Sequence, residues 1–247
     1  MGQVETEAIV LRTYDLAEAD RIVVCLTREA GMVRAVARGA RRLRSRFGAG
    51  LEPFTHIFLS YYEKEGRELV TLSHLEIRRS YFKFAGSVEI LSGMAYMCEL
   101  LMSFAPPHEP NEKLYRMVYA CLAAIEEAPE KLELIVRYFE VWLLKLAGFF
   151  SFTQTCLGCS RKLNEGQSVY IDSELRQLCE ACGKGSGIAL DREARASLLA
   201  MQRKSPKSFV QSSVEMKPAT QRELANLTRR FIRHVLEREV GQKAVKL

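Results

Sequence analysis

The sequence predicts an α+β multidomain protein, and three patterns along its 247 residues support this prediction. Residues 1–80 contain five short segments in which apolar and polar side chains alternate, as is typical of β-strands. From residue 81 onward, apolar residues recur at helical spacing. Residues 156–182 carry two Cys-x-x-Cys pairs. We therefore expect a β domain, a helical domain and a small cysteine-rich element.

The first 80 residues are predicted to form an N-terminal five-stranded OB-fold barrel. Turn residues separate the expected strands, which cover Glu7–Leu11, Ile22–Thr27, Met32–Arg38, Thr55–Tyr62 and Glu68–Leu75. Five short strands joined mostly by short turns are typical of an OB-fold, which binds oligonucleotides on one face. An SH3-like barrel would give a similar pattern. Aromatic residues at the fourth strand are able to stack on bases, although filling the core is their commoner role. They are Phe54, Phe58, Tyr61 and Tyr62.

An arginine-rich segment, Val33–Phe47, begins within the third expected strand and contains six arginines and no acidic residue. Gly39 breaks the strand pattern, and a loop with little apolar content is expected after it. Guanidinium groups match phosphate oxygens in bidentate fashion, so this segment is a candidate nucleic-acid contact. An ordinary solvated basic loop is the alternative interpretation. The candidate phosphate-binding residues are Arg34, Arg38, Arg41, Arg42, Arg44 and Arg46.

The second expected domain is α-helical and covers residues 81–150 and 188–247. Before residue 150, apolar stripes predict three helices with short connections. The first is expected to end before Pro106, and Asn111 is expected to cap the second. Gly148 has the position of a C-terminal cap for the third. The three helices are predicted to pack as a bundle.

The end of this domain is predicted to contain two further helices. Asp191 is expected to cap the first, and a loop is expected between Pro206 and Pro218, because proline interrupts helices. The second helix is expected to begin with a capping box at Thr220 and Glu223.

The last helix is predicted to have a basic face. At helical spacing, Arg222, Arg229 and Arg233 fall opposite an apolar stripe that contains Leu224 and Phe231. Residues 189–247 hold 13 Lys and Arg against 6 Asp and Glu, in a chain whose net charge is +6. This asymmetry favours a polyanionic partner, and the three arginines are a second set of candidate DNA contacts. A normal amphipathic helix with solvated cations is the alternative.

Four cysteines form the most specific chemical signal in the chain. Nineteen residues separate the pair Cys156 and Cys159 from the pair Cys179 and Cys182, which is a zinc-binding spacing. We expect residues 151–187 to form an inserted four-cysteine zinc ribbon, with a hairpin of residues 169–172 and 175–178. Four thiolates leave no open coordination position, so one structural Zn²⁺ per chain is expected. A thioredoxin-like redox pair would need a surrounding βαβ pattern, which the sequence lacks. Disulfides would need an oxidising compartment, and the sequence shows no export signal.

Several function classes find no support in the sequence. There is no P-loop, no nucleophile elbow and no metal-binding carboxylate pair beside a histidine, so we expect neither an enzyme nor a small-molecule substrate. No apolar run is long enough to span a bilayer, and no signal peptide begins the chain. A cytoplasmic protein without a membrane partner is expected.

The order of parts resembles the bacterial recombination-mediator family RecO. The matching segments, in one-letter code, are IVLR at Ile9–Arg12, EADRIV at Glu18–Val23, TREAG at Thr27–Gly31, VARGARR at Val36–Arg42, SRF at Ser45–Phe47 and LEPF at Leu51–Phe54. The resemblance implies an N-terminal OB-fold, a helical domain and a zinc element. Some members of that family lack the cysteines, whereas this chain has all four.

The resemblance also implies a function. A RecO protein is expected to bind single- and double-stranded DNA, to anneal complementary strands, and to help load recombinase onto DNA coated with single-strand DNA-binding protein. The implied partners are a RecR-type protein and single-strand DNA-binding protein, and the implied location is the bacterial cytoplasm, associated with the nucleoid. The alternative is a protein-interaction scaffold whose zinc ribbon and helical domain dock partners, with DNA contact incidental.

Overall fold

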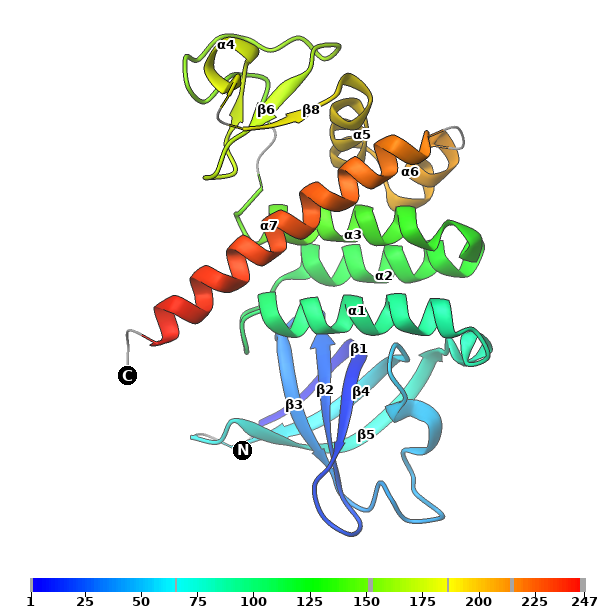
Figure 1. Cartoon of the computed structure of the whole chain (residues 1–247). Coiled ribbons are helices and arrows are strands. Elements are labelled where there is room, and N and C mark those ends of the chain that lie inside the picture. The colour runs from blue at the N-terminus through cyan, green and yellow to red at the C-terminus, as the bar shows by residue number, and fades with distance from the viewer. Residues whose placement is uncertain (1, 65, 151–152, 186, 214–215, 245–247) are drawn as a thin grey trace. The chain divides into compact units, whose positions relative to one another are not determined.

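The chain forms two compact units in the computed structural model, residues 1–129 and residues 130–247 (Figure 1). The structure describes residues 2–64, 66–150, 153–185, 187–213 and 216–244, and the side chains of the last helix as far as residue 237. No helix within these ranges is long and apolar enough to cross a membrane. The predicted helical domain begins at residue 81, whereas the first two helices share a compact unit with the barrel. The predicted division into three domains therefore stays a prediction. Its parts are residues 1–80, residues 81–150 with 188–247, and residues 151–187.

The first unit begins with a closed five-stranded barrel, which confirms the predicted OB-like fold. Its strands are β1 (Gly2–Asp15), β2 (Arg21–Thr27), β3 (Met32–Ala37), β4 (His56–Glu63) and β5 (Leu69–Arg79). The strand order is β1-β2-β3-β5-β4, and β4 pairs back onto β1, so that the ring closes. The β3–β5 pair is parallel, and the other four pairs are antiparallel. The first and fifth strands are longer than predicted, because their ends pair with neighbouring strands without an alternating pattern of burial.

The barrel interior is filled by apolar side chains from all five strands. Two of the four aromatic residues considered for base stacking, Phe54 and Tyr61, are buried, so they fill the core instead. Phe58 is half-buried, and the guanidinium of Arg78 lies 5.4 Å from its ring centroid. Tyr62 keeps 38% of its surface exposed.

Two helices complete the first unit, α1 (Val88–Phe104) and α2 (Glu112–Glu127). Asn111 caps α2 as predicted, because its side chain accepts a hydrogen bond from the backbone of Leu114 (3.0 Å). The α1 helix lies across one end of the barrel (Figure 1), and the Cys98 thiol donates to the carbonyl of Leu11 (3.1 Å). The α1–α2 connection packs so tightly on the β2–β3 turn that a Cβ at Gly31 would lie 2.2 Å from the Glu109 carbonyl oxygen.

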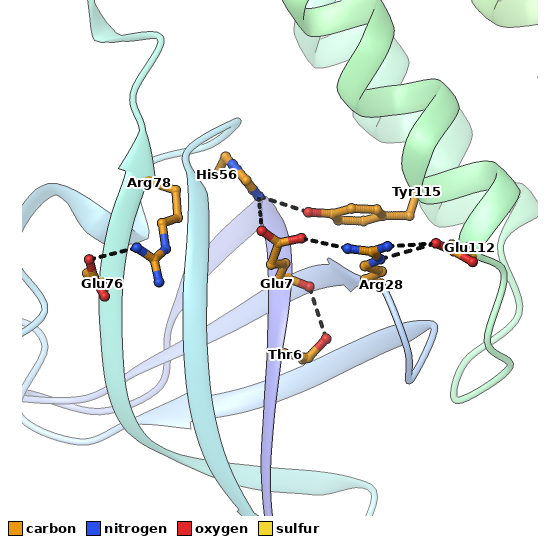
Figure 2. Close-up of polar contacts among 8 residues, drawn as sticks. All are labelled: Thr6, Glu7, Arg28, His56, Glu76, Arg78, Glu112 and Tyr115. Atoms are coloured by element: carbon orange, nitrogen blue, oxygen red, sulfur yellow. Dashed lines mark hydrogen bonds and ion pairs between the residues drawn. The ribbon is translucent and has the colours of Figure 1, made fainter.

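A polar network joins α2 to the barrel (Figure 2). The hydroxyl of Tyr115 and Nε2 of the buried His56 form a hydrogen bond of 2.8 Å, and His56 lies 4.0 Å from the Glu7 carboxylate. Arg28 bridges Glu7 (3.2 Å) and Glu112 of α2 (2.9 Å). Burial lowers the pKa of His56 below its ordinary value, and this effect exceeds the opposing effect of Glu7. The imidazole is therefore neutral in the folded protein at neutral pH.

The network predicts a pH-dependent stability. In the unfolded chain His56 has its ordinary pKa of about 6.5, so the unfolded state takes up a proton first as the pH falls. The contribution of His56 to stability is present above that pH and is lost below it. We measure the free energy of unfolding with urea at about pH 7.5 and at about pH 5.5. We expect this free energy to fall less between the two pH values in His56→Gln than in the parent. The same substitution at the exposed His74 is the control for loss of an imidazole, and equal slopes in the parent and in His56→Gln would contradict this assignment.

The second unit is a helical scaffold with a small sheet. It contains α3 (Leu132–Leu146), β6 (Val169–Ile171), β7 (Gln177–Leu178), α4 (Glu180–Gly183), β8 (Ile188–Leu190), α5 (Arg192–Arg203), α6 (Pro206–Ser212) and α7 (Pro218–Ala244). Gly148 follows α3 with φ of +80°, as its predicted capping role requires. The Asp191 side chain accepts from the backbone of Ala194, as predicted for the cap of α5.

The predicted hairpin is confirmed, because β6 pairs with β7, whereas two other predictions for this unit are wrong in detail. The sheet has a third strand, β8, which pairs with β6 next to the predicted hairpin. The predicted loop after α5 contains α6, because Ser205 caps a helix in which Pro206 occupies the first turn, where proline is tolerated. The α7 helix already begins at Pro218, so Thr220 lies inside the helix and forms no capping box. The Glu223 carboxylate instead accepts from the backbone of Asp191 (2.9 Å).

Candidate nucleic-acid interface and metal centre

The arginine-rich segment comprises most of β3 and the loop that connects β3 to the short helix at Gly48–Leu51. Successive turns shape it, with Ser45 N donating to Arg42 O (3.0 Å), and the buried side chain of Phe47 anchors its end in the barrel core. The segment is also tied to the β1–β2 loop, because Gly39 N donates to Asp20 Oδ1 (2.8 Å). Both loops lie at the end of the barrel away from α1 (Figure 1).

The six arginines of this segment differ in what they contact. Arg34 lies on β3 and pairs with Glu68 (3.2 Å). Arg41 binds Asp15 (3.6 Å) and donates to the Ala17 carbonyl (3.0 Å), so it braces the β1–β2 loop. The guanidinium of Arg46 lies 4.9 Å from the ring centroid of the neighbouring Phe47.

The remaining three arginines are Arg38, Arg42 and Arg44. They are exposed and have no ion-pair partner among the residues that the structure describes. Unpaired guanidinium groups keep all their donors available for phosphate oxygens. The sequence places six arginines in one segment, and among the described residues the structure leaves three of them without an ion pair or a ring contact.

The C-terminal arginines lie on the exposed side of α7. Arg222, Arg229 and Arg233 are exposed, and the predicted apolar stripe on the opposite side, with Leu224 and Phe231, is buried. Two of the three meet at a groove of about 340 Å³ between α3 and α7, which Arg222, Arg229, Arg137 and Glu133 help to line. Arg233 does not line this groove. The groove has a net positive lining and is open to solvent.

The four predicted metal ligands converge in the second unit. The ligand atoms of Cys156, Cys159, Cys179 and Cys182 all lie within 4.8 Å of one another, so the cluster could hold a metal ion. The first two cysteines come from a turn in which Ser160 N donates to Cys156 O (2.8 Å), and Ser160 adopts the left-handed φ of +58°. Of the other two, Cys179 is the N-cap of α4 and Cys182 lies within that helix.

Glycine at position 158 is favoured by close packing and not by a left-handed backbone. A Cβ there would lie 3.3 Å from both Cβ and Sγ of Cys182. A larger residue would therefore press on one of the sulfurs. Left-handed geometry in this part of the chain occurs instead at Ser160, Leu175 and Gly185.

The environment of the sulfurs favours a bound cation. The Cys156 sulfur accepts hydrogen bonds from the backbone of Gly158 (3.3 Å) and Cys179 (3.2 Å). Burial raises the pKa of Cys156, but the backbone N–H donors dominate and lower it to about 6. The pKa of Cys182 is raised to about 12, because its thiol is hydrogen-bonded to Cys179 and Cys159. Four thiolates so close together repel one another unless a cation lies between them, and a soft, tetrahedral metal ion suits this donor set.

Two further side chains support the cysteine element, and no sequence pattern singled them out. The fully buried Arg195 of α5 donates through Nη1 to the carbonyls of Asn164 and Gln167, in the segment between the two cysteine pairs. Asp172 accepts from the backbone of Arg176 (2.9 Å) and closes the β6–β7 turn. Arg195 escaped the sequence analysis because a buried arginine on an amphipathic helix has the same local pattern as an exposed one.

Comparisons with known proteins agree with this arrangement. A family model described as "Recombination protein O N terminal" matches residues 1–81, and one described as "Recombination protein O C terminal" matches residues 86–244. A DNA repair protein RecO from Anaeromyxobacter sp. (strain K) is 30% identical over 244 residues, which cover 98% of this chain and 95% of the relative. The RecO protein of Koribacter versatilis (strain Ellin345) is 30% identical over 243 residues, with the same coverage.

A third relative has the same sequence identity, but the match covers a smaller share of its length. The DNA repair protein RecO of Roseiflexus sp. (strain RS-1) is 30% identical over 234 residues, which cover 95% of this chain and 81% of the relative. The two family models together span nearly all of the chain, with one boundary close to the end of the barrel. A five-stranded ring, a helical unit and a four-cysteine cluster accompany this similarity. The chain therefore belongs to the RecO family of DNA repair proteins.

Proposed function

We propose that this protein is a non-enzymatic recombination mediator. It binds single- and double-stranded DNA, anneals complementary strands, and helps to load recombinase onto DNA coated with single-strand DNA-binding protein. Its protein partners are that coating protein and a RecR-type protein, as its family suggests. The observation that carries the proposal is the loop at the end of an OB-like barrel, where Arg38, Arg42 and Arg44 are exposed without ion-pair partners among the described residues.

The physical basis of the activity is neutralisation of phosphate. Arginines that contact phosphates release condensed counterions from the DNA, and this contribution is independent of base sequence. Annealing brings two polyanionic strands together, so cations on the protein must offset their mutual repulsion. No covalent bond changes in this process, and no catalytic residue is proposed.

Fluorescence anisotropy with single-stranded and duplex oligonucleotides, at several salt concentrations, tests this function. We expect log affinity to fall linearly with log salt, with a slope of about −0.7 for each phosphate contact to a single strand. Binding should be similar for oligonucleotides of different sequence. A scaffold that docks only proteins would show negligible binding at every salt concentration, and that result would replace the present proposal.

We further propose that the cysteine cluster holds one structural Zn²⁺ per chain. The four-sulfur donor set, the short distances between the sulfurs and the N–H donors to Cys156 support this assignment. Such a site orders the ribbon and has no open position for a substrate or a water molecule.

The basic side of α7 is proposed as a second DNA-contacting surface. Replacing Arg222, Arg229 and Arg233 with glutamine removes three cations and leaves the buried stripe intact. We expect single-strand affinity to fall modestly, by about threefold, and the annealing rate to fall further, since annealing needs cations on both strands. Annealing of two dye-labelled complementary oligonucleotides measures this rate. A folded variant that anneals at the parent rate would leave α7 with a purely structural role.

A further inference from the structure

One apolar side chain on the arginine-rich loop is unusually exposed. Leu43 has a relative exposure of 103%, against 79% for Val88 and 74% for Phe82. Its chain neighbours Arg42 and Arg44 are the exposed cations described above. A leucine side chain in full contact with water is unfavourable, and in this position it lies between two groups that attract phosphate.

The loop holds this side chain outward. Backbone hydrogen bonds from Arg42 N to Gly39 O (3.1 Å) and from Ser45 N to Arg42 O (3.0 Å) form two successive turns, and Leu43 lies within the second. The base of the loop is fastened to the β1–β2 loop, where Arg41 N donates to Ala19 O (3.0 Å). At the other end, Phe47 is buried in the barrel core. The loop is therefore braced at both ends, and Leu43 lies between the two anchored positions.

We propose that Leu43 is a wedge that enters between unstacked bases of single-stranded DNA, while Arg42 and Arg44 contact the phosphates beside it. This inference rests on the DNA-binding function proposed above. Minor-groove-binding proteins insert leucine and other apolar side chains between base steps of a duplex at the cost of unstacking the bases, and this cost is smallest where the bases are already single-stranded. The bases of a single strand are accessible to the loop, whereas in a duplex they are stacked and paired. Leu43 thus favours single strands and unpaired junctions over continuous duplex.

The test uses the full-length protein and a single-stranded oligonucleotide that carries 2-aminopurine, whose fluorescence increases when it leaves the base stack. The parent protein should raise this fluorescence at saturation. We expect Leu43→Ala to lose most of this increase in fluorescence. It should bind single strands about fivefold more weakly, because one small apolar side chain is removed from its contact with the bases. Its duplex affinity and its salt slope should stay at the parent values, because no cation is removed. Leu43→Phe should restore the fluorescence rise.

Val88→Ala is the matched control, because it shortens another exposed apolar side chain in the same compact unit, on α1. It should behave as the parent does. A Leu43→Ala variant that binds single strands and unstacks 2-aminopurine like the parent would overturn the wedge and leave the DNA-binding function standing, and Leu43 would then be assigned to a protein contact. Absence of DNA binding by the parent protein would overturn both proposals.

Discussion

Replacing Cys179 with serine is expected to abolish metal binding and to unfold the ribbon while the barrel stays folded. The ribbon is smaller than the roughly 40 residues below which a domain usually needs a metal, disulfides or oligomerisation to fold. Structural zinc contributes about 10–16 kcal/mol of binding energy in small zinc domains, and loss of one thiolate removes a large part of it.

Elemental analysis and hydrogen exchange measure this outcome together. The parent should contain about one equivalent of zinc, and Cys179→Ser should contain almost none. Amide protection should disappear in residues 153–185 and remain in β1–β5. Cys121→Ala is the control, because it removes a buried thiol outside the cluster, in α2, and should leave the zinc content unchanged. A metal-free parent protein with a protected ribbon would show that the four sulfurs are not a zinc site.

Replacing Arg38, Arg42 and Arg44 together with glutamine is expected to give the largest loss of DNA affinity. Three lost phosphate contacts should flatten the plot of log affinity against log salt by about two units for a single strand. At about 0.1 M salt this corresponds to a loss of roughly a hundredfold. The loss should be equal for all base sequences, because phosphate contacts carry no sequence information.

The control for this variant removes the same charge elsewhere on the same compact unit. Arg78, Lys113 and Arg116 are exposed cations of β5 and α2, outside the arginine-rich loop. Their replacement with glutamine should change the salt slope by well under one unit, about the effect of net charge alone. Equal losses in the two triple variants would mean that overall charge, and not the loop, determines DNA affinity.

Arg41 illustrates why the set of substitutions depends on the structure. The sequence alone makes Arg41 equivalent to Arg42 and Arg44 as a phosphate ligand. In the structure it binds Asp15 and the Ala17 carbonyl, so its replacement would also loosen the β1–β2 loop. A variant that includes Arg41 would therefore mix loss of a cation with loss of loop geometry.

Features that depend on residues close in sequence could be predicted from the sequence. Alternating and helical apolar patterns located the five strands of the barrel and helices α1, α2 and α3, because periodicity reflects which side of each element is buried. Caps at Asn111 and Asp191 involve donors only three residues away. The spacing of the four cysteines predicted their convergence, since two tight turns suffice to bring each pair together.

Other features depend on contacts between residues far apart in the chain, and only the tertiary structure decided them. Strand β8 is too short to show periodicity and exists because β6 offers it an edge. Glu223 has the local pattern of a capping box, yet it binds the backbone of Asp191 more than 30 residues away. The burial of Arg195 and the full exposure of Leu43 follow from the packing around them, which no local pattern encodes. The sequence by itself determined the family, the barrel, the helices and the cysteine cluster. The tertiary structure decided which arginines have no ion-pair partner among the described residues and which apolar side chain faces water. The reason is that long-range packing gives different partners to chemically identical residues.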